Sequence, residues 1–482
     1  MSLPPDSETA GQADRARWHA FAVCLGAGFM ALLDVSIVNV ALPSIEDALD
    51  AGPSDLQWIV AGYSLAFGLM LVPAGRVGDV LGRRRLFVGG LIAFVIFSAA
   101  CGMAPSAGVL ALCRLLQGLS AGTLNPQVVG LIQQLFSGSA RARAFGYFGA
   151  TVGLSTATGP LVGGLLIAAF GQEHGWRAVF LVNVPIGLLL IPLALRYLPG
   201  HDRRPAGRVD IDVVGLVLLG AAVVCVMLPF VVASEAQGDA PWWTVAVGLA
   251  CGGLFAWWER RLERAGGSPV LPAALVRTPS FAFGVAVGTA YFAGFTGLFL
   301  LSTLYLQQGL QLTPLQAGLT LTSFALCGAL SAARSGRMVQ RFGRWTVVGG
   351  ATVMIVGMVG VDLVAASMDG PRTPLVIAAC LAVAGLGNGN VVAPNQTLTL
   401  ADVPVERGGS AGGVLQTAQR VGASVGIAVV AAVFFSNLGS GGLAGGYGEA
   451  MSAGLRVNIA LLCVAVVAAG VDALRRRRRE PG

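Results

Sequence analysis

Long apolar stretches of about twenty residues, separated by short polar segments, dominate the pattern of this chain. A helix needs roughly 20 mostly apolar residues to cross a bilayer, and Pro and Gly residues punctuate the stretches at matching intervals. The pattern therefore predicts an all-α polytopic membrane protein with fourteen spans, at residues 18–42, 55–75, 86–104, 106–131, 143–170, 176–198, 211–233, 241–258, 280–306, 314–334, 345–367, 373–400, 408–436 and 452–474.

The distribution of arginine supports this count. Alternate loops hold 26 of the 31 basic residues, all of which are arginine. Because cytoplasmic loops carry the excess of basic residues, we expect both termini on the cytoplasmic side of the cell membrane. The run at residues 475–479 is expected to anchor the chain to anionic lipid headgroups. Arg114 and Arg420 differ from the others, since they lie inside predicted spans.

Composition narrows the class of protein further. Of the 482 residues, 55% are hydrophobic and only 11% are charged, whereas about a quarter are charged in a soluble domain. We assign the net charge of +7 to the cytoplasmic loops and not to nucleic-acid binding. The loops leave no room for a nucleotide-binding domain, and no phosphate-loop motif is present. The eight cysteines lie in apolar stretches and are interpreted as unpaired thiols, so neither a metal site nor a cofactor is expected.

Two pairs of segments repeat along the chain. Within the segment 75–84, residues 75–83 align with 336–344, and residues 118–122 align with 385–389. Both pairs are eight predicted spans apart, which indicates two related six-span halves with a binding site between them near the midplane. The predicted organisation is a cytoplasmic tail at 1–17, an N-terminal half at 18–198, a linker with two inserted helices at 199–278, a C-terminal half at 279–474 and a basic tail at 475–482.

Asp34 is the main candidate for chemistry, because it is a carboxylate inside the first apolar span. An ionised side chain at the bilayer centre costs roughly 2.5–3.5 kcal/mol or more, so such residues usually serve a function. Asp34 can exchange protons with water that enters from alternate sides, or it can pair with a cationic substrate. Arg114 in the fourth span is a buried cation that needs carboxylate or polar partners, and Gln117 lies one turn further along. A hydrogen-bonded structural Asp34 and an Arg114 that reaches for the interface are the alternatives.

The loop between the second and third spans is a candidate gate. Gly75 and Gly82 permit close packing and a tight turn. Asp79 can pair with Arg83 or with a helix N-terminus across the cytoplasmic seam. The alternative is that the arginines of this loop only fix the topology.

The fifth span carries a second motif. Pro160 removes a backbone hydrogen bond, and Gly159, Gly163 and Gly164 allow close helix contact. The motif therefore predicts a bend that favours opening on one side only, and an ordinary packing seam is the alternative. Hydrophobic, aromatic and polar positions expected to line the substrate cavity are Phe29, Tyr63, Gln117, Phe295, Asn388, Asn390 and Arg420.

These motifs resemble those of the major facilitator superfamily. Residues 75–84 look like its motif A, 114–118 like motif B and 159–164 like motif C. Residues 33–43 resemble the first-span signature of the fourteen-span drug:H⁺ antiporters (the DHA2 family). The chain departs from the pattern at Ser155, where motif C often has glycine, and at Gln340 in the second loop motif.

The resemblance implies the major facilitator fold, with two six-helix bundles and two inserted helices. It also implies proton-coupled efflux of amphipathic drug-like or antibiotic molecules by alternating access, with protons as the coupling ion and Asp34 and Arg114 in proton coupling. We expect a monomer. A dedicated exporter of one endogenous metabolite and a proton symporter for uptake are the alternatives, and a membrane-embedded enzyme or receptor is a remote one.

Overall fold

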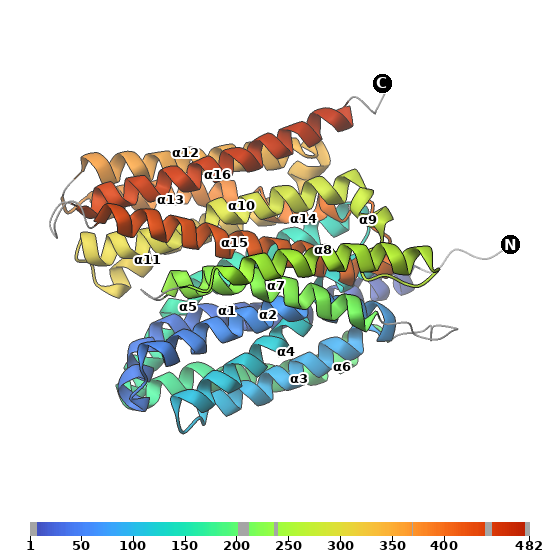
Figure 1. Cartoon of the computed structure of the whole chain (residues 1–482), viewed down its shortest axis with the longest axis horizontal. Coiled ribbons are helices and arrows are strands. Elements are labelled where there is room, and N and C mark those ends of the chain that lie inside the picture. Colours follow the sequence, from blue (N-terminus) through green and yellow to red (C-terminus); the bar gives the residue numbers. More distant parts are fainter. Residues whose placement is uncertain (1–6, 201–211, 236–239, 369, 439–445, 478–482) are drawn as a thin grey trace.

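A computed structural model describes residues 7–200, 212–235, 240–368, 370–438 and 446–477. In these ranges the chain forms long helices that lie side by side, and no strands (Figure 1). The helices are α1 (Ser7–Leu49), α2 (Pro53–Leu81), α3 (Arg83–Gly102), α4 (Ala107–Leu135), α5 (Gly138–Leu181), α6 (Asn183–Tyr197), α7 (Val213–Glu235), α8 (Trp243–Arg264), α9 (Ala273–Arg277), α10 (Pro279–Leu304), α11 (Pro314–Phe342), α12 (Trp345–Ser367), α13 (Thr373–Gly389), α14 (Val392–Thr399), α15 (Gly408–Leu438) and α16 (Gly446–Arg477).

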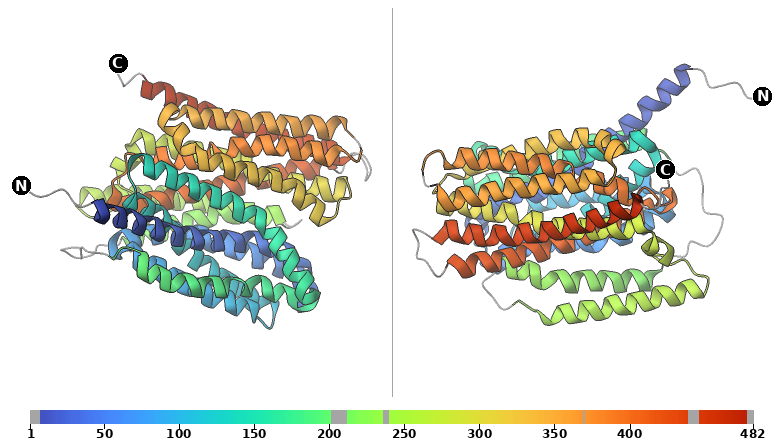
Figure 2. Two further views of the ribbon diagram at one scale, coloured as in Figure 1. Left: turned by 180° about the vertical axis from the view of Figure 1, so that it is seen from behind. Right: turned by 90° about the horizontal axis from the view of Figure 1, so that it is seen from above.

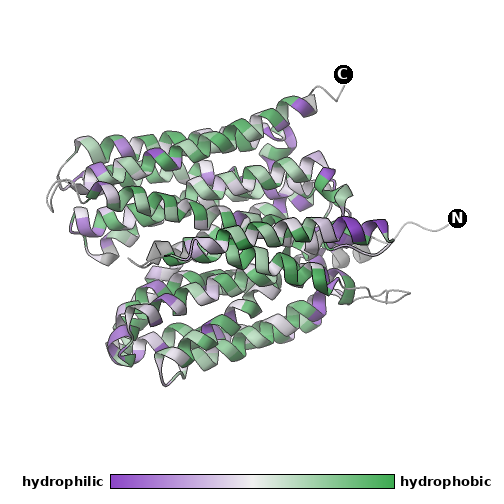
Figure 3. Ribbon diagram, in the orientation of Figure 1, coloured by the Kyte–Doolittle hydropathy of each residue, from purple (hydrophilic) through white to green (hydrophobic). Residues whose placement is uncertain are grey.

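Thirteen helices of the described chain are long and apolar enough to cross a membrane. Figure 3 shows the hydrophobic colour along the helices and a strongly hydrophilic end on α8. The predicted span at 241–258 corresponds to α8, whose last turns run into the charged residues 259–264. Because of these charges, α8 is not among the thirteen, and the fourteenth span stays a prediction. The length of α8 and its packing against α7 fit a helix at membrane depth.

Two predicted spans are joined in α5. The helix continues through Pro160 and breaks at Gly171, where φ is 79°. Glycine adopts this left-handed conformation without steric cost. The break separates a span at 138–171 from one at 173–197, as expected from the sequence.

The ends of the chain differ in part from the prediction. Residues 7–17, expected as part of a tail, are the first turns of α1. Residues 1–6 and 478–482 of the two predicted tails lie outside the described residues, as do residues 201–211 of the predicted linker. The helix α1 begins, and α16 ends, at the same end of the bundle, which we call the terminal face (Figure 1).

The two repeated segments take equivalent positions in the two halves. A side chain at Gly118 of α4 would clash with the backbone of Tyr63 in α2. A side chain at Gly385 of α13 would clash in the same way with the backbone of Phe324 in α11. Glycine is therefore required in both places for close helix contact. Two large hydrophobic clusters match this arrangement, one formed mainly by helices α1–α6 and the other by α10–α16.

The α7–α8 pair lies on one side of the bundle (Figure 2). The helix α7 packs against both α2 and α15, which belong to different halves. Aliphatic side chains make this contact: Leu65 of α2, Met227 and Val223 of α7, and Val421 of α15 share one cluster. The inserted pair thus covers the seam between α2 and α15. At the other seam α5 packs directly against α11.

Candidate transport site

The carboxylate of Asp34 is the centre of a buried polar cluster. Arg114 Nη1 donates to Asp34 Oδ2 at 2.5 Å. Gln117 Nε2 and Asn183 Nδ2 donate to Asp34 Oδ1 at 3.0 and 2.9 Å. Asp34 is 0% and Arg114 2% exposed, so α1, α4 and α6 together hold an ion pair away from solvent.

The cluster has a second layer. Asn183 also donates to Ser98 Oγ at 3.0 Å, and Gln117 Oε1 accepts from Arg114 Nη1 at 2.9 Å. The guanidinium of Arg114 lies 4.1 Å from the centre of the Tyr63 ring. These contacts hold the buried carboxylate in place, although Asn183 Oδ1 has no hydrogen-bond partner in the described chain. Asp34 and Arg114 were both predicted to act in proton coupling, but their direct contact was not predicted. Asn183 and Ser98 had no predicted role, although polar side chains in apolar spans were the available signal.

Asp79 forms a latch across the terminal face. Its Oδ1 accepts from Arg83 Nη2 at 2.8 Å within the same half. Its two oxygens also accept from the backbone N–H groups of Gly409 and Ser410 at 3.0 and 2.7 Å, and from the Ser410 hydroxyl at 2.8 Å. The carboxylate thus meets the first turn of α15, where free N–H groups and the helix dipole favour an anion. Arg83 adds a bond to the carbonyl of Val405, so the latch joins the two halves at two points.

Gly75 and Gly82 serve the geometry of this latch. A side chain at Gly75 would clash with the carbonyl of Gly409, so the backbones of α2 and α15 touch here. Gly82 separates α2 from α3 with φ of 106°, a conformation that favours glycine. In the second loop motif, a Cβ added at Gly336 of α11 would lie 3.0 Å from the backbone of Ala142 in α5. The halves are therefore in close contact at both seams near the terminal face.

The span-five motif packs against α1. A side chain at Gly159 would clash with Ser36, and one at Gly163 would lie 3.1 Å from Ile37. These contacts lie one turn or less beyond Asp34 along α1, so the motif adjoins the buried ion pair. The expected contact at Gly164 is wrong, because its Cβ position has nothing within 4 Å. The expected bend at Pro160 stays a prediction.

The residues expected to line a cavity fall into two groups. Tyr63 is 1% and Gln117 0% exposed, so in this structure both belong to the buried cluster around Asp34, and the expectation that they line an open space is wrong for this state. The other five are partly exposed: Phe29, Phe295, Asn388, Asn390 and Arg420.

Within the second group, the contacts of three residues are defined. Phe295 stacks on Tyr291 and Phe324, with ring centres 5.6 and 5.7 Å apart. Asn388 accepts from the Tyr291 hydroxyl at 2.7 Å, and Asn390 donates to Ser331 Oγ at 2.6 Å. These side chains join α10, α11 and α13 within the C-terminal half.

A second buried ion pair was not predicted. Arg344 Nε donates to Asp472 Oδ2 at 2.5 Å, and Arg344 Nη1 donates to Asn395 Oδ1 at 2.7 Å. Both charged side chains are nearly inaccessible. Arg344 aligns with Arg83 in the repeat, but Asp472 and Asn395 both lie in the C-terminal half. The pair therefore ties α12, α14 and α16 together and does not cross the seam.

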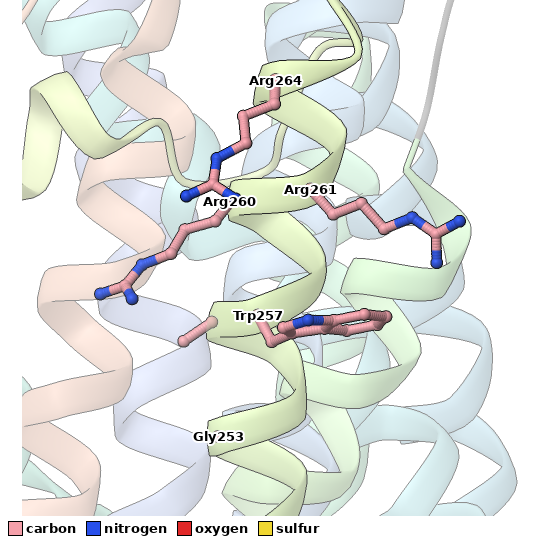
Figure 4. Close-up of a pocket in the computed structure, with 6 residues that line it drawn as sticks. Gly253, Trp257, Arg260, Arg261 and Arg264 are labelled. Atoms are coloured by element: carbon pink, nitrogen blue, oxygen red, sulfur yellow. The ribbon is translucent and has the colours of Figure 1, made fainter.

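Two surface hollows lie away from these clusters. One, of about 360 Å³, is lined by Trp257, Arg260, Arg261 and Arg264 at the charged end of α8 (Figure 4). The other lies between α3 and α4. Neither contains a predicted cavity residue. In the described part of the chain, no group of three or more His, Cys, Asp or Glu side chains is placed to hold a metal ion.

Known proteins resemble the chain over most of its length. It is 38% identical to the probable actinorhodin transporter of Streptomyces coelicolor over 90% of this chain and 76% of that protein. It is 33% identical to the multidrug resistance protein Stp of Mycobacterium tuberculosis, over 84% of this chain and 73% of Stp. It is also 33% identical to the tetracenomycin C resistance and export protein of Streptomyces glaucescens, over 87% of this chain and 76% of that protein.

The fold has solved counterparts as well. The crystal structure of the human organic anion transporter MFSD10 matches with a TM-score of 0.67 and 16% identity, over 97% of this chain and 100% of that one. At this identity the match supports the fold alone. The sequence profile described as Major Facilitator Superfamily matches residues 24–427 and 283–480. The chain therefore belongs to the major facilitator superfamily and is a multi-pass membrane transporter, not an enzyme.

Proposed function

We propose that this transporter exports amphipathic drug-like or antibiotic molecules from the cell in exchange for protons. The observation that carries the proposal is the Asp34–Arg114 pair, in which a carboxyl group with 0% exposure lies inside a membrane helix. A carboxylate in this setting has a high free-energy cost, so such residues usually serve a function. The names of relatives, which include a multidrug resistance protein and an export protein, support export.

The proposed cycle follows from the chemistry of the pair. A proton taken up by Asp34 cancels its charge and so weakens the attraction that holds Arg114. The released Arg114 and the freed amides of Gln117 and Asn183 then favour a different packing of α1, α4 and α6. Loss of the proton on the other side restores the pair. A proton bound and released on opposite sides thus shifts the population between two states of the transporter.

The arginine pattern supports an orientation with the terminal face, and with it both termini, in the cytoplasm. In that orientation the latch of Asp79 closes the cytoplasmic end, and it must open before a substrate can enter from the cell. The functional unit in this proposal is a single chain.

Everted membrane vesicles test the proposal. In vesicles that contain the wild-type protein, an imposed pH gradient should drive uptake of an amphipathic dye, and an uncoupler should stop it. The variant D34N should insert at normal levels and show no proton-driven uptake. The exposed acid Asp14 provides a control, since D14N should keep full activity. Full activity of D34N, or uptake that ignores the uncoupler, would refute the coupling role.

A dedicated exporter of one metabolite is the second candidate. Several relatives have names that refer to a single compound, among them actinorhodin and tetracenomycin C. Neighbouring biosynthetic genes would favour this candidate over broad drug export. The direction of flux under an imposed pH gradient distinguishes either form of export from uptake by symport.

A further inference from the structure

Arg420 is an arginine at membrane depth, and its surroundings differ from those of Arg114. It lies on α15, twelve residues from Gly408 at the terminal face, which corresponds to about 18 Å along the helix. Its guanidinium lies 4.5 Å from the centre of the Phe67 ring on α2, so it sits where the two halves meet. The side chain is partly exposed. Because a guanidinium in contact with lipid at this depth is costly, we take this exposure to be toward water between the halves.

The charge of Arg420 has no partner in the described part of the chain, either in an ion pair or in a hydrogen bond. Two carboxylates inside the membrane spans lie beside other arginines. Asp34 pairs with Arg114, and Asp362 lies 3.8 Å from Arg456. Five N–H donors of a planar guanidinium are therefore available to a ligand, in a geometry that suits a carboxylate.

Two polar side chains beside Arg420 are also unsatisfied. Gln416 Oε1 and Thr417 Oγ1 are buried and have no hydrogen-bond partner in the described chain. They lie four and three residues before Arg420, so helical spacing places all three on one face of α15. Gln416 is 9% and Thr417 7% exposed. Buried polar groups are usually paired, so these two atoms are available to a ligand or to water beside Arg420.

Arg420 is connected to the proton-coupling pair through aromatic rings. Arg114 lies over the Tyr63 ring, Tyr63 stacks on Phe67 at 6.2 Å, and Arg420 lies over Phe67. The two rings, one turn apart on α2, separate the two guanidinium groups. A ligand that pulls Arg420 away from Phe67 therefore disturbs a stack that ends on the partner of Asp34.

We infer that Arg420 binds the negatively charged group of the substrate, a carboxylate or a phenolate on an amphipathic molecule. Gln416 and Thr417 supply further hydrogen bonds to the same molecule. The positive charge of Arg420 also repels cationic molecules, so the site would favour anionic over cationic substrates. This inference rests on the proposed function and makes it more specific: the exporter prefers anionic over cationic substrates. It replaces the cationic preference that the sequence suggested, because Asp34 is fully buried and already paired.

Two dyes with the same three-ring xanthene core test the preference, namely anionic fluorescein and cationic rhodamine 123. Equilibrium binding of each dye is measured by fluorescence anisotropy on the purified full-length protein. Wild type should bind fluorescein more tightly than rhodamine 123. R420Q should weaken fluorescein binding at least tenfold and change rhodamine 123 binding less than threefold. R420K should give an intermediate loss, because it keeps the charge but not the planar fork.

A matched control is available on the outer surface of α8. Arg261 also lies over an aromatic ring, that of Trp257 at 5.5 Å, and R261Q should leave both affinities unchanged. Equal fluorescein affinity in wild type and R420Q would overturn the inference. So would a wild-type preference for rhodamine 123, or no saturable binding of fluorescein. If R420Q does not fold, the relative affinity of the wild type for the two dyes and the fluorescein affinity of R420K still test the inference.

Transport in proteoliposomes under a pH gradient separates this inference from the proposed function. Failure of the wild type to move either dye would count against proton-coupled export, while the binding measurement would still decide the role of Arg420. Proton-driven transport of rhodamine 123 alone would support the proposed function and overturn the anionic preference.

Discussion

Asp79 of the N-terminal half accepts a hydrogen bond from the backbone N–H of Ser410 at 2.7 Å, at the first turn of a helix in the C-terminal half. A single carboxylate thus holds the two halves together at the terminal face. That bond goes to Oδ2, while Oδ1 accepts from Arg83 and from the Gly409 N–H, so the carboxylate has partners in both halves. Opening this face therefore requires that the bonds to α15 break together.

The variant D79N should open the terminal face more often. The amide keeps the shape but loses the charge that the α15 N-terminus and Arg83 favour, an effect of about 1–3 kcal/mol for charged hydrogen bonds. We expect transport to fall at least tenfold. Spin labels on α5 and α15, in a variant without native cysteines, should show longer distances at the terminal face. D14N should show the wild-type distances, and unchanged distances in D79N would contradict the latch.

The buried pair of Asp34 and Arg114 should show strong coupling in a double-mutant cycle. Removal of one partner leaves an uncompensated buried charge, which typically costs about 3–5 kcal/mol. R114Q should therefore lower the thermal unfolding temperature in detergent more than D34N/R114Q does. If the two single losses simply add in the double variant, the pair does not act as a unit.

Gly75 should not tolerate even a methyl group. In G75A the new Cβ would meet the carbonyl of Gly409, so α2 and α15 must separate and the latch must lengthen. Transport should fall severalfold. G89A is the matched control, because Gly89 on α3 has nothing within 4 Å of its Cβ position. Alanine stabilises a helix interior relative to glycine by roughly 0.5–1 kcal/mol, so G89A should be fully active and no less stable.

The pair of Arg344 and Asp472 should matter for stability more than for coupling. D472N leaves the Arg344 guanidinium buried beside a neutral amide, so we expect a lower unfolding temperature and a lower yield. The surviving protein should still require the proton gradient for transport, because this pair does not cross the seam. An uncoupler assay on the purified, reconstituted variant checks this. Proton-independent transport by D472N would show that the pair takes part in coupling.

The sequence predicted the membrane spans because bilayer thickness sets a length that apolar stretches must match. It also brought Asp34 and Arg114 together as candidates, since a charge inside an apolar span is conspicuous. It could not predict that Asn183 completes the cluster, because residues 34 and 183 are far apart in the sequence and only the packing of α1 against α6 brings them into contact.

Other misses have equally physical causes. Tyr63 and Gln117 were expected to face a cavity, but a helical pattern does not tell a buried polar cluster from a water-filled space. Asp472 was not selected because it lies near the end of its predicted span, where charged residues are common at the membrane surface. The contact of Gly164 failed for a similar reason: four closely spaced small residues cannot all face the same neighbour on one helix.

The position of α7 has a mechanical consequence. It rests on α2 and α15 at once, so any rocking of one half against the other must move α7 relative to at least one of them. The contact is made by branched and flexible aliphatic side chains, and hydrophobic contact has no preferred direction. Such a surface can slide by small steps while it stays covered. We therefore expect the α7–α8 pair to stay in contact with both halves and to keep lipid tails out of this seam throughout the transport cycle.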